Sequence, residues 1–417
     1  INECADTRTY PCFGLCNNTM GSFQCSCPPG TKGNASIEPC RPDPFPIGAR
    51  LGVAEVFCHK QRNKRQGYFE QHGGEMLSRF LIAEGNTSFK FYDREHIVKA
   101  TRNFHKSNII GEGAHGTVYK AILSLGDDTM APVAVKRCKQ IDTSRTKEFI
   151  QELMILCRVN HLNIVRLLGC CLHFQAPMLV YEFVPNGTLN DLLHGSPRRG
   201  MTLATRLRIA AETAVALAHL HSRTILHGDV KPENILLGDR WVAKVSDFGC
   251  STIDDNTQVV PKGSLAYLDP EFLDDFSLTD KTDVYSFGVV LMELLTRRKP
   301  RPKEQKNLTK MFEECMGNGN LCELLDADVV QEGYSAMEVI HQTTELARLC
   351  TAVPGKERPP MGQVAEELQR LSDKRPEDSE AIQALEGHGY SHTGCEADPT
   401  GFYSIDSRAA LSTELAR

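Results

Sequence analysis

The sequence predicts an α+β chain in which a small disulfide-rich module precedes a larger domain with two lobes. Six of the 16 cysteines fall within the first 40 residues. Strand patterns dominate residues 104–184, whereas helical patterns dominate residues 185–372 and are strongest at 203–221 and 284–295. Strand-rich sequence followed by helix-rich sequence indicates an α+β fold.

The N-terminal cysteines indicate a disulfide framework. They are Cys4, Cys12, Cys16, Cys25, Cys27 and Cys40. A segment this small cannot bury enough apolar surface to fold unaided, so cross-links formed in an oxidising compartment are expected. A zinc module is the rival interpretation, but paired C-x-x-C sequences are missing and no histidine precedes His59. Because six cysteines allow fifteen pairings in principle, spacing alone leaves the connectivity open.

Residues 227–234, followed 13 residues later by Asp247-Phe248-Gly249, are the most informative about chemistry. Phosphoryl transfer requires a carboxylate that orients the attacking hydroxyl, ligands for Mg2+ and positive charge near the phosphates. Asp229 suits the first role. Asn234 and Asp247 suit the second because Mg2+ prefers oxygen ligands. Lys231 can steady the transferred group, so Asp229, Lys231 and Asn234 are the expected catalytic residues.

A glycine-rich loop lies upstream of this segment. Gly111, Gly113 and Gly116 fit the pattern G-x-G-x-x-G, in which the backbone can approach phosphates closely. Three glycines alone would also fit a hairpin or a dinucleotide loop, but a dinucleotide loop opens a helix and here a strand pattern follows. Lys136 ends the next strand, 20 residues after Gly116. We expect it to contact phosphates rather than to be a solvated edge lysine.

The acidic partner of Lys136 is expected on an amphipathic helix at residues 146–159. Phe149 and Leu156 mark the buried side of this helix. Glu152 lies three residues after Phe149 and four before Leu156, so it shares that side. We predict an ion pair between Lys136 and Glu152, with Glu148 as the alternative if the register differs by one turn.

In this order and spacing, the motifs resemble those of protein kinases. The resemblance extends downstream, where residues 268–271 occupy the place of the Ala-Pro-Glu signature. Asp283 matches the buried aspartate that supports the catalytic loop, and Arg358 matches the arginine that pairs with the signature glutamate, here Glu271. The resemblance implies a two-lobed kinase fold over residues 104–372, with lobes at 104–184 and 185–372. It also implies that ATP and Mg2+ are used.

Further stretches are similar to plant wall-associated receptor-like kinases, and this resemblance covers about residues 1–372. The stretches are 1–4, 21–25, 69–74, 91–92, 100–104, 167–171 and 179–183. The family implies a single-pass type I receptor of the plasma membrane with a cytoplasmic serine/threonine kinase. Its partners would be proteins with serine or threonine acceptors and an extracellular ligand, either wall-derived or a protein. Lys231 favours serine/threonine over tyrosine specificity.

The resemblance also implies a nucleotide site, in which Tyr181 is the gatekeeper and Glu182 and Val184 offer backbone groups to adenine. The expected ATP-binding residues are Ile110, Gly111, Gly113, Gly116, Val118, Ala134, Lys136, Glu152, Tyr181, Glu182, Val184 and Leu236. Gly228 replaces an arginine that normally pairs with a phosphorylated activation loop, so we expect weak dependence on loop phosphorylation. Kinases without that arginine are common among immune-type plant receptors. The expected phosphorylation sites are Ser251, Thr252, Thr257 and Ser264.

Residues 1–40 resemble an EGF-like module, whose family pairing is Cys4–Cys16, Cys12–Cys25 and Cys27–Cys40. The segment 16–25 resembles the calcium-binding subclass, in which Asn2, Glu3 and Asn18 would supply oxygen atoms to Ca2+. This subclass begins with an acidic residue that is missing before Ile1, so we expect an N-terminally truncated module. An EGF-like fold without calcium stays open.

An oxidised module joined to a kinase implies a membrane between them, which would require about 20 apolar residues. Residues 41–66 read instead as a linker, whose apolar stretch 47–58 is interrupted by Arg50 and Glu55. The basic run at 60–65 resembles the cytoplasmic side of a stop-transfer signal. We interpret 47–58 as a shortened transmembrane segment and 67–103 as juxtamembrane, and we expect membrane association. A gene-model deletion, a splice variant and a soluble product all stay open.

Composition narrows the remaining functions. The net charge of −6 argues against nucleic-acid binding. Residues 373–417 are polar without lasting periodicity, which predicts a disordered tail.

The alternative to an active kinase is a pseudokinase scaffold that binds ATP or partners with little transfer. A mainly adhesive EGF protein would leave the complete catalytic set unexplained.

Overall fold

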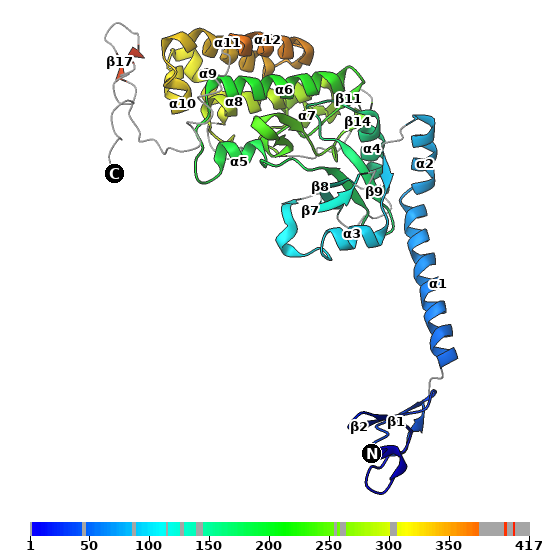
Figure 1. Cartoon of the computed structure of the whole chain (residues 1–417). Helices are drawn as coiled ribbons and strands as arrows, with labels where there is room; N and C mark the ends of the chain where they lie inside the picture. Colours follow the sequence, from blue (N-terminus) through cyan, green and yellow to red (C-terminus); the bar gives the residue numbers. More distant parts are fainter. Residues whose placement is uncertain are drawn as a thin grey trace, which may run out of the picture. The chain divides into compact units, whose positions relative to one another are not determined.

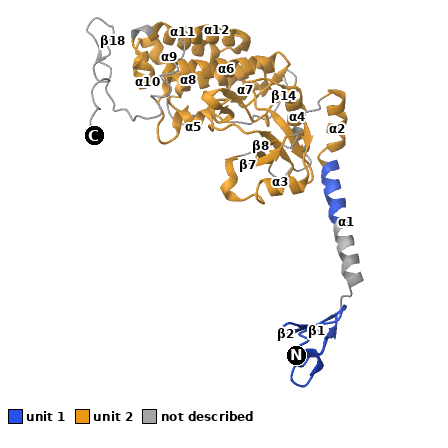
Figure 2. Cartoon of the chain, in the orientation of Figure 1, with its two compact units in different colours: residues 1–70 blue, residues 71–417 orange. Residues whose placement is uncertain are grey.

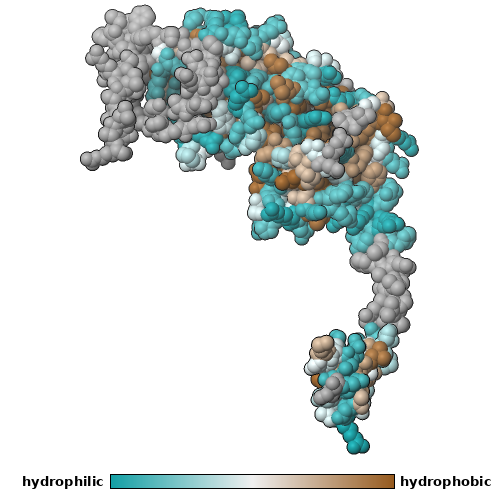
Figure 3. All heavy atoms as spheres, in the orientation of Figure 1, coloured by the Kyte–Doolittle hydropathy of each residue, from teal (hydrophilic) through white to brown (hydrophobic). Residues whose placement is uncertain are grey.

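The computed structural model of the chain describes residues 2–43, 47–85, 89–113, 116–125, 129–138, 145–253, 257–258, 264–300, 307–374, 396–397 and 403–404. The chain divides into two compact units, residues 1–70 and 71–417, and each is considered by itself (Figure 2). On the face drawn in Figure 3, most of the coloured surface is hydrophilic and hydrophobic residues form small groups, as is ordinary for globular proteins.

Unit 1 begins with the cysteine-rich module. Its elements are η1 (Glu3–Ala5), β1 (Leu15–Thr19), β2 (Ser22–Ser26), β3 (Thr31–Lys32) and β4 (Arg41–Pro42). The strands form the antiparallel pairs β1–β2 and β3–β4. The disulfides join Cys4 to Cys16, Cys12 to Cys25 and Cys27 to Cys40, which is the EGF-like pairing. Within residues 2–43 Ala35 is the one buried hydrophobic residue, so cross-links stand in for a core.

A helix, α1 (Ile47–Gln71), occupies most of the segment that the sequence led us to expect as a linker. Residues 47–71 contain no proline and are rich in residues that favour helices, which accounts for the helical conformation. In the part of the chain that the structure describes, no helix is long and apolar enough to cross a membrane. The expected tail at 373–417 lies largely outside the described residues, apart from the antiparallel pair β17 (Glu396–Ala397) and β18 (Tyr403–Ser404).

The first part of unit 2 contains a six-stranded sheet, to which the strands labelled β7, β8 and β9 in Figure 1 belong. Its strand order is β5-β9-β10-β8-β7-β6. Its strands are β5 (Lys90–Phe91), β6 (Ile109–Gly113), β7 (Gly116–Ser124), β8 (Met130–Cys138), β9 (Leu167–Cys171) and β10 (Met178–Glu182). Neighbours are antiparallel except β5 and β9, which are parallel. The strand predicted after the glycine-rich loop is confirmed as β7, and the next predicted strand is confirmed as β8, which continues two residues beyond Lys136. Val133, Val135 and Val180 are fully buried, as branched residues in a central strand should be.

Three helices and a turn accompany the sheet. They are α2 (Gly74–Ala83), α3 (Arg94–Ala100), η2 (Lys106–Asn108) and α4 (Arg145–Arg158). Helix α4 confirms the helix predicted at 146–159. Its residues Phe149, Leu153 and Leu156 are buried, and so is Glu152, which is 7% exposed. The predicted inward side of this helix is therefore the observed one.

The second part of unit 2 is mainly helical. Its helices are α5 (Leu189–His194), α6 (Leu203–His221), α7 (Pro270–Asp275), α8 (Asp280–Thr296), α9 (Leu308–Asn318), α10 (Ala327–Val330), α11 (Tyr334–Cys350) and α12 (Met361–Asp373), with turns η3 (Pro232–Asn234), η4 (Asp239–Trp241), η5 (Leu321–Glu323) and η6 (Gly355–Glu357). Helix α6 has the predicted bounds, and the threonine before it, Thr202, caps it by accepting from the Thr205 N–H. Helix α8 is buried on nearly all sides and forms the centre of this part.

Short two-stranded pairs join these helices and shape the loops of the site. The strands are β11 (Ile225–Leu226), β12 (Ile235–Leu237), β13 (Ala243–Val245), β14 (Thr252–Ile253), β15 (Thr257–Gln258) and β16 (Ser277–Leu278). The pairs are β11–β14, β12–β13 and β15–β16, all antiparallel.

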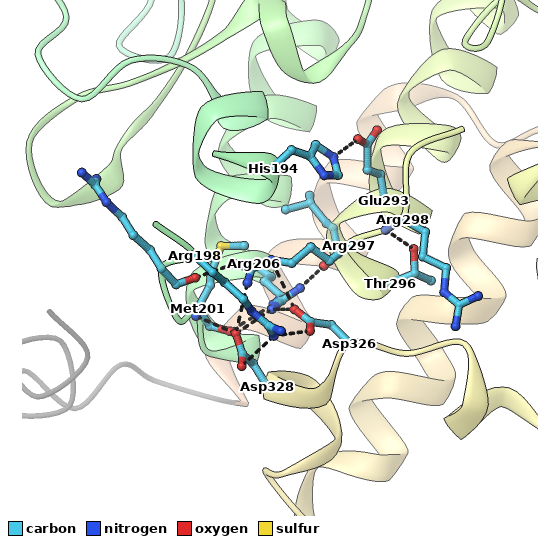
Figure 4. Close-up of polar contacts among 12 residues, drawn as sticks. His194, Arg198, Met201, Arg206, Glu293, Thr296, Arg297, Arg298, Asp326 and Asp328 are labelled. Atoms are coloured by element: carbon cyan, nitrogen blue, oxygen red, sulfur yellow. Dashed lines mark hydrogen bonds and ion pairs between the residues drawn. The ribbon is translucent and has the colours of Figure 1, made fainter. Parts of the chain in front are cut away.

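A buried ionic cluster joins α6, the end of α8 and the start of α10 (Figure 4). The Arg206 side chain, 1% exposed, pairs with the Asp326 carboxylate. Arg198 lies 2.6 Å from Asp326 and 3.1 Å from Asp328, and Arg297 lies 3.4 Å from Asp326. Burial alone would raise the pKa of Asp326, but Arg206 and the other arginines outweigh it and lower that pKa. These ion pairs tie α6, the end of α8 and the start of α10 together.

Candidate active site

Lys136 links the two parts of unit 2. Its Nζ lies 3.3 Å from Glu152 Oε1 on α4 and 2.8 Å from Asp247 Oδ1, which belongs to the helical part. The side chains of Lys136 and Glu152 are only 10% and 8% exposed. Burial alone would lower the pKa of Lys136, but the carboxylates of Glu152 and Asp247 raise it well above its ordinary value. Lys136 is therefore a fixed cation, and Glu152 rather than Glu148 is its helix partner.

Tyr181 adds a contact that the sequence did not predict. It ends a buried stretch of β10, and its hydroxyl donates to Glu152 Oε1 at 3.2 Å. Burial raises the pKa of Tyr181 well above its ordinary value, so the hydroxyl keeps its proton and acts as the donor. Glu152 is consequently held from both β8 and β10.

The catalytic-loop residues converge between β11 and β12. Lys231 Nζ donates to Asp229 Oδ2 at 2.6 Å. The Asn234 amide donates to the Asp229 carbonyl oxygen at 2.8 Å and to Asp229 Oδ2 at 3.0 Å. Proline at the first position of η3 fixes the turn that brings Asn234 back toward Asp229. The Asp229 carboxylate, 4% exposed, is thus held in one orientation.

Asp283 supports this loop from the first turn of α8. Its carboxylate accepts from the backbone N–H groups of His227 at 2.8 Å and Gly228 at 2.9 Å, and from His221 Nε2 at 2.9 Å. Burial would raise the pKa of Asp283, but the hydrogen bond from His221 and the nearby imidazoles lower it overall. His227 in turn accepts from the Asp229 N–H and donates through Nε2 to the Ser246 carbonyl. Asp283 therefore makes the contacts that a residue supporting the catalytic loop is expected to make.

Asn234 and Asp247 carry the oxygen atoms suited to Mg2+. The Asn234 amide nitrogen is the donor toward Asp229, so the carboxamide oxygen faces away from those bonds and has the right chemistry for the ion. Asp247 is joined to Asn234 through its neighbour Ser246, whose N–H and hydroxyl both donate to the Asn234 carbonyl. These two residues fit a Mg2+ site.

The expected nucleotide-site residues lie in or next to β6, β7, β8 and β10 of the sheet, and Leu236 lies in β12 of the helical part. Gly111 and Gly113 are in β6 and Gly116 opens β7; the pairing joins Gly111 to Val118 and Gly113 to Gly116. Val118 is paired with Lys136, and Ala134 with Tyr181. Half-buried side chains are those of Val118, Ala134, Glu182, Val184 and Leu236, whereas Ile110 is 49% exposed. Incomplete burial next to the fully buried Val133 and Val135 is what a ligand-facing surface requires.

The expected phosphorylation sites differ in their accessibility. Ser251 and Thr252 are 8% and 7% exposed, and the Ser251 hydroxyl donates to the His227 carbonyl at 3.0 Å. Thr257 lies in β15, and Ser264 accepts from Lys231 Nζ at 3.5 Å. A kinase could reach Ser251 or Thr252 only after this segment opens. Gly228 has φ +75° and its added Cβ would lie 2.8 Å from the Cys250 carbonyl oxygen.

The predicted pair of Arg358 with Glu271 is present, but Asp269 is a closer partner of Arg358. Arg358, whose side chain is fully buried, makes its short bidentate contact with Asp269, while its Nη2 lies 3.8 Å from Glu271 Oε2. Asp269 also caps α7 by accepting from the Glu271 N–H. With this cap, the Glu271 carboxylate faces the Gly355 N–H and accepts a hydrogen bond from it at 2.9 Å. Glu271 is therefore the minor partner of Arg358.

The expected calcium ligands lie together at the start of unit 1. Asn18 Oδ1 accepts from the Glu3 N–H at 3.0 Å. Glu3 Oε2 is buried and has no hydrogen-bond partner among the described residues. A buried carboxylate oxygen without a donor is compatible with a cation, so Glu3, Asn18 and the neighbouring Asn2 fit Ca2+ in chemistry. Groups of three or more His, Cys, Asp or Glu side chains suited to a metal do not occur in the described part of the chain.

Comparison with known proteins gives consistent matches. A family model described as protein tyrosine and serine/threonine kinase matches residues 104–368. Wall-associated receptor kinase 5 of Arabidopsis thaliana is 38% identical over 464 residues, covering 100% of this chain and 62% of that protein. Wall-associated receptor kinase 1 of the same plant is 37% identical with the same coverage. Wall-associated receptor kinase-like 16 is 42% identical over 77% of each chain. This chain thus spans 62% of the length of the first two relatives.

Proposed function

The chain belongs to the wall-associated receptor kinase family, and on that premise we propose that it is a receptor-like serine/threonine protein kinase. It would transfer the γ-phosphoryl group of ATP to serine or threonine hydroxyls of proteins. The signalling would start at the cell surface, in response to the cell wall or in defence. The relatives' names carry the terms wall-associated and receptor, which supports this setting.

The observation that carries the proposal is the joint contact of Lys136 with Glu152 and Asp247. This contact brings a cation from the sheet to the acidic group of the helical part, at 2.8 Å. A scaffold that only binds partners has no need of such an arrangement. Together with Asp229, Lys231 and Asn234, this contact supports phosphoryl transfer, because the groups that the reaction requires belong to one compact unit.

Each residue then has a role in transfer. Asp229 would orient the substrate hydroxyl and accept its proton as the bond to phosphorus forms. Lys231, 2.6 Å from Asp229, would stabilise negative charge on the transferred group. Lys136 would bind phosphate oxygens, with Glu152 and Tyr181 fixing its position. Asn234 and Asp247 would hold Mg2+, which offsets the phosphate charge.

Specificity for serine and threonine rests on Lys231 and its neighbour. Lys231 Nζ lies 3.5 Å from the Ser264 hydroxyl on the activation segment, so the lysine spans the distance from the catalytic carboxylate to the expected substrate side. This arrangement favours a short hydroxyl-bearing side chain whose backbone lies near the activation segment.

The test is phosphate transfer from γ-labelled ATP by the purified full chain with Mg2+ and a general protein substrate. Asp229→Asn should lower kcat by roughly 10^2–10^4-fold. Asp239→Asn, at an exposed position in η4, is the matched control and should leave kcat unchanged. Label on serine and threonine supports the specificity, and label on tyrosine contradicts it. Nucleotide binding without transfer by the unmutated chain would favour the scaffold alternative.

We also propose that the EGF-like module faces the cell exterior and the kinase the cytoplasm. Disulfides persist in oxidising compartments, and ATP is cytoplasmic, which supports this orientation. Protease treatment of microsomes carrying the chain should protect the module and leave the kinase open to digestion. We propose that Asn2, Glu3 and Asn18 bind Ca2+. Calorimetric titration of Ca2+ into the full chain and into its Glu3→Gln variant tests this, and the variant should bind Ca2+ more weakly.

A further inference from the structure

We propose that the α2 segment, residues 72–85, positions Glu152 for its contact with Lys136. The α2 segment lies upstream of residues 104–368, which match the kinase family model. It would nevertheless be part of the catalytic apparatus, because it contacts the helix that carries Glu152. The inference rests on the proposed kinase function and assigns positioning residues to it.

His72 connects the sheet with α4. His72 is 1% exposed, and its Nε2 donates to the Phe174 carbonyl oxygen at 3.0 Å. Phe174 lies between β9 and β10 and belongs to the sheet core. The imidazole also meets the Phe149 ring edge-on, with 6.3 Å between centroids. One buried side chain therefore bonds to the sheet side and packs on α4.

Gly73 and the apolar side of α2 extend this contact. Gly73 has φ +70°, and a Cβ there would lie 2.7 Å from Ile150 Cδ1, so its backbone packs directly on α4. Leu77 and Leu81 are 2% and 6% exposed, which shows that α2 buries one whole side. Ile82, on the same helix, is 79% exposed.

The far end of α2 contacts the last turn of α4. The Arg158 guanidinium lies over the Phe80 ring, 4.9 Å from its centroid, and its Nε lies 3.3 Å from Glu84 Oε1. The contacts on α4 therefore begin before Glu152, at Phe149 and Ile150, and end after it, at Arg158. Helix α4 is held on both sides of the residue that matters for Lys136.

The contacts reach both sides of α4, because His72 packs on Phe149, which shares the buried side with Glu152, whereas Gly73 packs on Ile150. At 3.6 residues per turn, Ile150 lies about 200° around the helix from Glu152. The α2 segment thus contacts α4 beside Glu152, at Phe149, and away from it, at Ile150, while Glu152 projects to Lys136 and Tyr181. Because Lys136 is fixed in β8, the Lys136–Glu152 distance depends on where α4 stands relative to the sheet. The α2 segment contacts both and would set that position.

The experiment compares matched variants of the full chain. Leu77→Ala removes buried contact from α2, and Ile82→Ala removes an exposed side chain of similar size from the same helix. Both are made in the native background and in a Glu152→Gln background. The readouts are kcat/KM for ATP, the Kd of a fluorescent ATP analogue and thermal unfolding.

We expect Leu77→Ala to lower kcat/KM for ATP by about 2-fold to 30-fold in the native background. Binding of the fluorescent ATP analogue should weaken by a similar factor. In the Glu152→Gln background the same substitution should have little further effect, because its route through Glu152 is already lost. In both backgrounds, Ile82→Ala should have the same kcat/KM for ATP and the same Kd for the analogue as the chain without this substitution. Equal losses in both backgrounds, or equal behaviour of Leu77→Ala and Ile82→Ala, would overturn the proposal.

His72 supplies a second test if Leu77→Ala fails to fold. Glutamine can place an amide N–H where His72 Nε2 donates, so His72→Gln should retain most of the nucleotide affinity that His72→Ala loses. Equal affinities of the two variants and the unmutated chain would contradict the inference. The proposed function fails separately: the unmutated chain would then transfer no phosphate, while the analogue Kd would still report on α2.

Discussion

The hydroxyl of Tyr181 donates to Glu152 Oε1 at 3.2 Å, and the same oxygen faces the ammonium group of Lys136 at 3.3 Å. One carboxylate oxygen therefore receives a neutral donor and a cation inside the protein. Burial of Tyr181 keeps its hydroxyl protonated, since its pKa is raised well above the ordinary value. The side chain expected to be the gatekeeper of the nucleotide site thus also orders the Lys136–Glu152 ion pair.

Tyr181→Phe should weaken ATP use while leaving the fold intact. A lost hydrogen bond of this kind costs about 0.5–1.5 kcal/mol, which corresponds to roughly a 2-fold to 10-fold fall in kcat/KM for ATP. The control is Tyr92→Phe, because the buried Tyr92 hydroxyl has no hydrogen-bond partner among the described residues. Steady-state kinetics at varied ATP decides the matter, and equal values for the two variants would contradict the role of Tyr181.

Gly228→Ala should reduce both stability and turnover. At φ +75° a side chain costs about 1–2 kcal/mol, and the new Cβ would press on the Cys250 carbonyl oxygen at 2.8 Å. Because Gly228 directly precedes Asp229 and its N–H donates to Asp283, the strain should reach the catalytic loop. Gly362→Ala is the control, since open space surrounds that exposed glycine in α12. Unfolding midpoints and kcat are the measurements, and an unchanged Gly228→Ala would refute the strain.

Ser251→Asp should lower activity by at least about tenfold, the effect of a few kcal/mol for a buried charge without a partner. The Ser251 hydroxyl donates to the His227 carbonyl, and an aspartate there would set two acceptor groups against each other. Ser251→Ala loses one hydrogen bond and should keep most activity, as weak dependence on loop phosphorylation requires. Transfer rates of the two variants test this, and a stimulated Ser251→Asp variant would reverse the interpretation.

Arg358→Ala should destabilise the helical part of unit 2 strongly. Removing one partner of a buried pair costs about 3–5 kcal/mol because the other charge stays buried, here Asp269. Arg358 also stacks on the Tyr285 ring at 5.0 Å. Arg370→Ala breaks a surface pair with Glu367 and should leave the unfolding midpoint nearly unchanged. Similar midpoints for both variants would show that the Arg358 pair is not a stabilising centre.

Stability should fall at mildly acidic pH because of His72. Burial lowers the pKa of His72 below its ordinary value of 6.5, so the native state holds the imidazole neutral while the unfolded state takes up a proton. The contribution of His72 is therefore complete above about pH 6.5 and is lost as pH falls toward the native pKa. Unfolding midpoints of the native chain and His72→Gln between pH 5 and 8 should diverge, with the native chain losing more. The opposite slope would contradict a buried neutral His72.

The sequence was sufficient to predict a contact where that contact follows from the spacing of residues within one element. Glu152 could be placed on the inner side of α4 because Phe149 and Leu156 define that side. Asp229, Lys231 and Asn234 lie on one turn, so their proximity follows from short separations along the chain.

The sequence was insufficient where neighbouring side chains compete for one partner. Asp269 and Glu271 are two residues apart, and their spacing did not predict that Asp269 is the closer partner of Arg358 while Glu271 lies 3.8 Å away. The bond of Tyr181 to Glu152 joins residues 29 apart on different elements. The contact of His72 with Phe174 spans 102 residues, and its one signal was a histidine beside two glycines.

The short strand β5 has a practical consequence for how this kinase can be excised. Lys90 and Phe91 pair with Gly169 and Cys170 of β9, and the Tyr92 N–H donates to the Cys170 carbonyl at 2.8 Å. A fragment that begins at residue 104, where the family match starts, would bare the outer edge of β9. An unpaired strand edge invites other chains to add to it, so such a fragment should self-associate. The smallest autonomous piece therefore begins before Lys90.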